Sequence, residues 1–213
     1  MRAVSEVRSR RTTTYSVMMV LAASVWLIPA PPVRAQEIDE AKVLKVKAAY
    51  LYNFAKFITW PDDALGDAQS TFIIGILGDD RFQKILSNTV EGKKIANRPV
   101  KIERFHWSEQ ADRARLKTCQ VLYISHAEQS RLKDIFAELE GHPVLLVASL
   151  PDFAGDGGMI GFVLDKHRII FEINREALAQ AELKASAKLL KLARIVQTGE
   201  KRLQESRSAK GKP

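Results

Sequence analysis

Four short apolar segments, separated by stretches long enough for a helix, constrain the fold of this chain more than any other feature. They are residues 72–77, 100–105, 121–124 and 144–148. The first, third and fourth are nearly continuous in Ile, Leu and Val, which is typical of strands covered by helices on both faces. The stretches between them, 79–88, 108–116 and 129–140, predict helices, with Asp79 and Ser108 as N-caps. The alternation predicts an α/β fold with a mostly parallel sheet sandwiched by helices.

The pattern changes after residue 150. Residues 150–158 contain three glycines, two aspartates and a proline, which predicts an exposed, mobile loop. Two strand-like runs, 159–164 and 168–173, are joined by a short connection and predict an antiparallel β-hairpin. Asn174 and Ser186 are candidate N-caps for two closing helices, the second over 187–196.

An amphipathic helix is predicted ahead of the first strand, over residues 47–61. Its apolar side includes Tyr50 and Phe54. Pro61 should end the helix, because proline cannot donate a backbone hydrogen bond and disfavours the α conformation for Trp60. Lys47 falls within the apolar arc, so we expect its ammonium to meet a carboxylate or main-chain carbonyl oxygens, or to reach water. We interpret Lys47, Trp60 and Pro61 as structural residues. Glu172 is one candidate partner for Lys47.

The first 35 residues read as a secretory signal. A basic start precedes the apolar run 17–28, and Val33 and Ala35 are small residues suited to cleavage after Ala35. A run of 12 residues is shorter than the roughly 20 that span a bilayer. We therefore expect a cleaved signal peptide over 1–35, a single α/β domain over 36–198 and a basic disordered tail over 199–213. Without the signal the net charge falls from +8 to +4, and nothing indicates a nucleic-acid partner.

The chain has one cysteine, Cys119, at the start of an apolar strand. An internal disulfide is excluded, and packing alone must hold the exported domain together. We expect Cys119 to be a buried core residue.

No catalytic or metal-binding arrangement is predicted. Ser125 and His126 are adjacent at a strand end, where neighbouring side chains point in different directions. The four histidines fall in four separate connections without the spacing of metal ligands: His106, His126, His142 and His167. We expect a protein that is not an enzyme and has no cofactor.

A binding function fits the hairpin residues better than a catalytic function does. The hairpin is apolar on both faces; one face should cover the core, and the other is either buried as well or meets a partner. The candidate partner-binding residues are Ile160, Phe162, Glu172, Asn174 and Leu178. An alternative site is a small-ligand pocket near Tyr50, Tyr52 and Phe54.

Taken together and in order, several motifs resemble the YfiR-like family of periplasmic proteins. They lie at residues 47–61, 97–100, 119–125, 157–161, 171–174 and 183–196. The resemblance implies a small α/β protein of the Gram-negative periplasm, often dimeric. It also implies binding to the periplasmic sensor domain of an inner-membrane diguanylate cyclase, which represses the cyclase, lowers cyclic di-GMP and restrains biofilm formation. Characterised members carry paired cysteines, so this chain, with Cys119 alone, departs from them and lacks redox gating by an internal disulfide.

The resulting expectation is a periplasmic regulatory binding protein, a homodimer, that represses a membrane signalling enzyme, a diguanylate cyclase first of all. The alternative is a periplasmic small-ligand receptor or an adaptor for a sensor histidine kinase.

Overall fold

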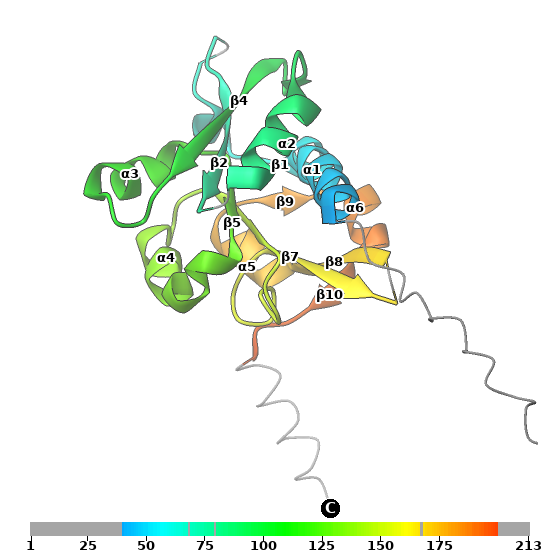
Figure 1. Ribbon diagram of the computed structural model, residues 1–213. Helices are drawn as coiled ribbons and strands as arrows, with labels where there is room; N and C mark the ends of the chain where they lie inside the picture. The colour runs from blue at the N-terminus through cyan, green and yellow to red at the C-terminus, as the bar shows by residue number, and fades with distance from the viewer. Residues whose placement is uncertain (1–39, 68, 79, 167, 200–213) are drawn as a thin grey trace, which may run out of the picture. The chain divides into compact units, whose positions relative to one another are not determined.

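The computed structural model describes residues 40–67, 69–78, 80–166 and 168–199 (Figure 1). The predicted signal peptide lies outside these residues, as do the candidate N-cap Asp79 and all but the first residue of the predicted tail. Within the described part of the chain, no helix is both long and apolar enough to cross a membrane. The strands are β1 Ile58–Thr59, β2 Phe72–Leu77, β3 Lys94–Ile95, β4 Arg98–Phe105, β5 Val121–Ile124, β6 Leu145–Ala148, β7 Ile160–Asp165, β8 Arg168–Asn174, β9 Lys184–Ala185 and β10 Arg194–Val196.

Helices connect most of these strands. They are α1 Glu40–Phe57, α2 Asp80–Val90, α3 Gln110–Arg115, α4 Leu132–Glu138, α5 Arg175–Gln180 and α6 Ala187–Leu192, with 3₁₀ turns at Asp62–Leu65, Leu116–Thr118 and His126–Arg131. Figure 1 shows α1, α2 and α6 on one side of the main sheet and α3 and α4 on the other. The predicted α/β sandwich is confirmed.

The main sheet has eight strands in the order β10-β8-β7-β6-β5-β2-β4-β3. Its centre, β4-β2-β5-β6-β7, is parallel throughout. Numbered along the chain, these five strands have the order 2-1-3-4-5 of doubly wound flavodoxin-like sheets. β2 and β5 have the predicted bounds, because strands buried on both faces are visible as continuous apolar runs.

The hairpin of β7 and β8 extends this parallel centre. The two strands are antiparallel and pair from Ile160 with Ile173 to Asp165 with Arg168, as predicted. Asn174 caps α5 and Ser186 caps α6 through side-chain oxygens that accept backbone N–H groups. The second closing helix is shorter than predicted: it ends at Leu192, and β10 then pairs in parallel with β8 at the edge of the sheet.

Two further expectations are corrected. α1 ends at Phe57 and not at Trp60, because Ile58 and Thr59 leave the helix to pair with Ala185 and Lys184 of β9. Residues 150–158 are not a wholly exposed loop: Phe153 and Ala154 are buried in it. The Gly155 carbonyl also accepts the N–H of Gly199 at 2.7 Å. An apolar ring and distant hydrogen bonds therefore anchor a segment whose composition predicts mobility.

Candidate functional site

One face of the C-terminal hairpin is covered by α1. The Phe54 ring lies 5.5 Å from that of Phe162 and 4.8 Å from that of Phe171. Tyr50, one turn earlier, lies 5.5 Å from Phe171. Offset and tilted ring pairs at these separations add to the stabilisation that comes from burying apolar area. Through this aromatic cluster α1 packs against the β7–β8 hairpin.

The other face is held by Asn174, the last residue of β8, which is fully buried. Its side-chain oxygen accepts the N–H groups of Glu176 and Ala177, each at 3.1 Å. Its side-chain nitrogen donates to the Ala154 carbonyl at 2.8 Å and to the Thr198 hydroxyl at 3.1 Å. Both hydrogen-bonding ends of the amide are thus used to join β8, α5, the 150–158 segment and the chain after β10.

The structure places the predicted partner-binding residues mainly inside the domain, on both faces of the hairpin. Ile160, Phe162, Asn174 and Leu178 are each at most 5% exposed. Ile160 and Phe162 lie on the face that α1 covers, whereas Val163 and Ile170 on the second face are half-buried. Ile160, Phe162, Asn174 and Leu178 present no surface in this conformation. Their role in partner binding stays a prediction, and Asn174 is first of all a structural residue.

Glu172 is the only member of that predicted set that is not fully enclosed. It accepts a hydrogen bond from Arg194 of β10 at 3.1 Å. Arg194 also lies 3.7 Å from Asp165 at the end of β7. Glu172 is therefore paired with Arg194, and its pairing with Lys47, suggested by the sequence, stays a prediction.

Apolar side chains also reach solvent in this C-terminal part of the chain. Leu192 is 73% exposed, Leu164 53% and Ile195 46%. Leu164 pairs with Ile169 and Ile195 with Ile173, so both lie on the sheet face that carries Phe171 and contacts α1. We call Leu164, Leu192 and Ile195 the C-terminal apolar surface.

None of these three residues was predicted from the sequence. Their positions could have indicated exposure: Leu164 is the last apolar residue before the hairpin turn, and Ile195 is on an edge strand that the sequence pattern presents as helix.

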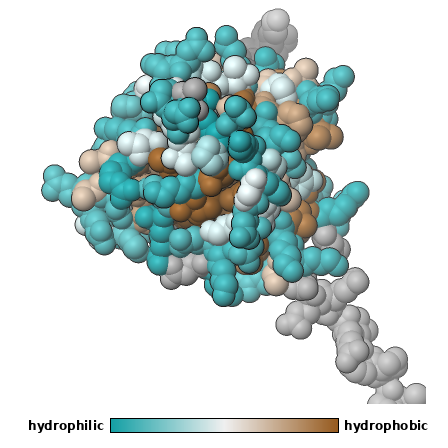
Figure 2. Space-filling model, turned by 90° about the horizontal axis from the view of Figure 1, so that it is seen from above, coloured by the Kyte–Doolittle hydropathy of each residue, from teal (hydrophilic) through white to brown (hydrophobic). Residues whose placement is uncertain are grey.

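Figure 2 shows apolar side chains gathered in a hollow on one face of the molecule, framed by hydrophilic ones.

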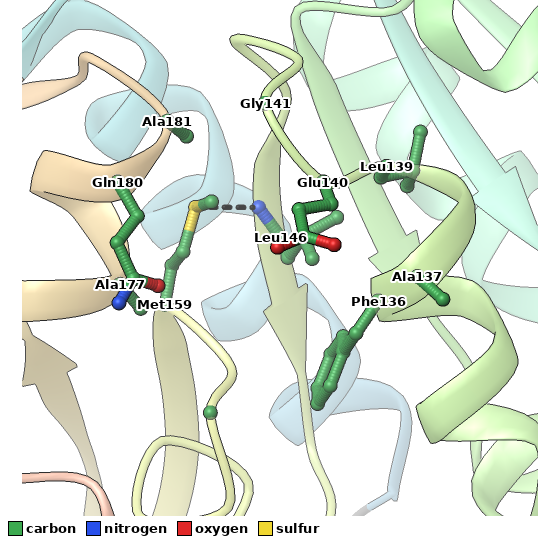
Figure 3. A pocket seen from close by; sticks show the side chains of 11 residues that line it. Phe136, Ala137, Leu139, Glu140, Gly141, Leu146, Met159, Ala177, Gln180 and Ala181 are labelled. Atoms are coloured by element: carbon green, nitrogen blue, oxygen red, sulfur yellow. Dashed lines mark hydrogen bonds between the residues drawn. The ribbon is translucent and has the colours of Figure 1, made fainter.

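A groove of about 740 Å³ opens between α4 and α5. Figure 3 shows Phe136 and Glu140 on one wall, Ala177 and Gln180 on the other, and Met159 between them. β6 pairs with β7 only at Val147 and Ala148. At Leu146 the backbone N–H instead meets the Met159 sulfur at 3.4 Å (Figure 3). A thioether is a weak acceptor. The regular backbone hydrogen bonding between β6 and β7 therefore ends beside this groove.

The predicted aromatic ligand pocket does not form as one site. Tyr50 and Phe54 pack in the aromatic cluster, whereas Tyr52 faces the β3 side, where its hydroxyl donates to the Lys94 carbonyl at 3.3 Å. The ammonium of Lys93 lies 4.8 Å from the Tyr52 ring centroid. The groove between α4 and α5 and three smaller grooves of about 280–410 Å³ are lined by other residues.

The residues predicted as structural are packed as such. Lys47 is half-buried and has an interaction partner, so it is not a lone buried charge. Trp60 is buried edge-on against Phe72, with ring centroids 5.2 Å apart. Pro61 precedes a 3₁₀ turn that begins at Asp62 and does not itself end α1.

Among the described residues at the carboxyl ends of the parallel strands, Ser125 and His126 do not form a nucleophile and base pair. Ser125 is buried, and its hydroxyl has no hydrogen-bond partner among the described residues. His126 next to it is exposed, and no described base accepts a hydrogen bond from that hydroxyl. Burial raises the pKa of the Cys119 thiol to about 12, which keeps it protonated and unreactive at neutral pH.

One comparison with known proteins identifies the chain. Residues 44–194, from α1 to the start of β10, match the YfiR/HmsC-like family. This family is associated with the repression of diguanylate cyclases and is generally regulatory, not catalytic. The match spans most of the chain and includes the aromatic cluster, the hairpin and both closing helices. The chain belongs to the YfiR/HmsC-like family.

Proposed function

We propose that this protein is exported to the periplasm, with cleavage near Ala35, and represses a diguanylate cyclase of the inner membrane by binding the cyclase's periplasmic sensor domain. The observation that carries the proposal is the family match over residues 44–194. The absence of an assembled nucleophile, base and oxyanion site among the described residues agrees with a binding role.

Repression follows from a difference in affinity between two states of the target. A protein that binds the inactive sensor conformation better than the active one shifts the population towards the inactive state. The size of that shift is limited by the difference between the two affinities. No chemical step is required of the repressor itself.

The C-terminal apolar surface is the docking surface that we propose for the sensor domain. Leu164, Leu192 and Ile195 supply the exposed apolar area, whereas the ion pairs of Arg194 with Glu172 and Asp165 lie on the opposite face of the same strands. Exposed apolar side chains of this kind are typical of the centre of a protein interface. The neighbouring Ile160, Phe162 and Leu178 would support this surface from inside.

Co-purification with the membrane fraction tests both statements. The wild-type protein should retain the cyclase, and Ile195→Asp and Leu192→Asp should lose it while remaining folded. Ala114→Asp is a matched control, because Ala114 is exposed on α3 on the other side of the molecule (Figure 1).

Loss of binding by Ala114→Asp, or full retention by both surface variants, would show that the surface is wrong. If the surface variants instead convert a dimer to monomers and keep cyclase binding, the surface belongs to a second copy of this chain. Failure of the wild-type protein to retain any cyclase would contradict the proposed function itself.

A further inference from the structure

We propose that His106, Glu109 and Asp112 form a binding site for a divalent transition-metal ion of the Zn²⁺ class. Each residue offers one ligand atom, and no two of these atoms are more than 4.8 Å apart. The sequence analysis compared the histidines only with one another and expected no metal. The structure instead combines one imidazole with two carboxylates at a spacing of three residues.

The distances suit an ion of this size. The Nδ1 atom of His106 lies 3.5 Å from an Asp112 carboxylate oxygen and 3.9 Å from one of Glu109. An ion at the centre of such a triangle would be at most about 2.4 Å from each atom, against about 2.0–2.2 Å for zinc with nitrogen and oxygen ligands. Small side-chain rotations close the difference, since His106 and Glu109 are both exposed.

The backbone holds the three residues in place before any ion arrives. His106 directly follows β4, and Glu109 is the N-cap residue of α3, in which Asp112 lies. The Asp112 carboxylate is largely buried and accepts the backbone N–H of His106 at 2.8 Å. Arg113 donates to the Trp107 carbonyl at 2.7 Å. A loop fixed in this way loses little freedom on binding, which favours affinity.

The ligand types determine which ions the site would prefer. Imidazole nitrogen suits zinc, copper and nickel, whereas magnesium and calcium prefer sites made of oxygen alone. Arg115 opposes binding, because one of its nitrogens lies 3.6 Å from the other Asp112 oxygen. Arg115 also donates a hydrogen bond to Glu103, whose negative charge partly offsets the positive charge of Arg115. We therefore expect moderate affinity and open coordination positions for water.

Calorimetric titration of the untagged protein with ZnCl₂ tests the site. The wild-type protein should bind one ion per chain. His106→Ala and Glu109→Gln should each weaken binding at least tenfold, and MgCl₂ should give no saturable binding. His126→Ala is the matched control, since His126 is also exposed and also follows a parallel strand, and it should bind like the wild type.

Glu109→Gln changes an exposed side chain, so we expect it to leave the fold intact. This variant still tests the metal site if His106→Ala alters the loop. Absence of zinc binding by the wild-type protein would overturn the proposal. So would wild-type affinity in both site variants, or a loss in His126→Ala as large as that in His106→Ala. None of these outcomes bears on the proposed repression of a cyclase.

Discussion

Replacement of Asn174 by alanine separates a structural role from a binding role at this position. The amide oxygen caps α5, and the amide nitrogen bonds the Ala154 carbonyl and the Thr198 hydroxyl. Alanine removes all of these bonds within a fully buried site. We therefore expect Asn174→Ala to lower the free energy of unfolding.

The expected magnitude follows from the bonds that are lost. Loss of an N-cap costs about 1 kcal/mol. A buried carbonyl left without its donor, here that of Ala154, costs roughly 1–3 kcal/mol more. The total of about 3 kcal/mol would lower Tm by roughly 6–12 °C in a chain of this size. Ser186→Ala is the matched control: Ser186 caps α6 with a single bond of 3.3 Å to the Leu189 N–H and should cost at most about 1 kcal/mol.

Urea unfolding followed by circular dichroism, together with calorimetric Tm values, measures both variants. The reasoning is refuted if Asn174→Ala is no more destabilising than Ser186→Ala. Unchanged stability with lost partner binding would instead show that Asn174 acts at an interface, as the sequence analysis predicted.

Three further predictions concern the core and its turns. Gly78→Ala should destabilise the protein at least twice as much as Gly92→Ala. Both glycines have positive φ, but a Cβ at Gly78 would lie 2.3 Å from the Ser125 hydroxyl oxygen, whereas nothing lies within 4 Å at Gly92; equal losses in urea unfolding would contradict this. The Cys119 thiol should resist a thiol reagent at pH 8 until the protein is unfolded, and labelling of the native protein at the rate of a free thiol would show that it is not buried. Because the unfolded thiol ionises near its usual pKa of 9.0 and the folded one only at about 12, this group should make stability fall as pH rises between these values.

The sheet was largely predictable because its central strands are covered on both faces. Continuous Ile, Leu and Val identify β2 and β5 with the bounds that the structure shows. The caps Asn174 and Ser186 were also found from sequence, since N-capping depends on local side-chain chemistry. Local rules succeeded where the relevant neighbours lie a few residues away.

The errors arose where distant contacts override local preference. Ile58 leaves α1 because it pairs with Ala185, far along the chain. Arg194–Val196 continues an apparent helical stripe but joins β8 as an edge strand. Phe153 is buried within a glycine-rich segment, and Gly158 allows this, because a Cβ there would lie 2.3 Å from the Phe153 ring.

The candidate site was the least predictable part. The alternation of β7 and β8 shows that both hairpin faces are apolar, but it does not show what covers each face. In the structure α1 covers one face with Phe54, and Asn174 ties the 150–158 segment to the other. Ile160 and Phe162 therefore lie inside the domain, and Leu164 and Ile195 are exposed instead.

The amount of cyclic di-GMP in cells tests the central claim most directly. It should be measured in cells that lack this protein, in cells that carry the wild type, and in cells that carry Ile195→Asp at equal periplasmic abundance. The account predicts a rise on deletion, full reversal by the wild type and no reversal by Ile195→Asp. Cyclic di-GMP that is unchanged on deletion would contradict repression of a cyclase by this protein.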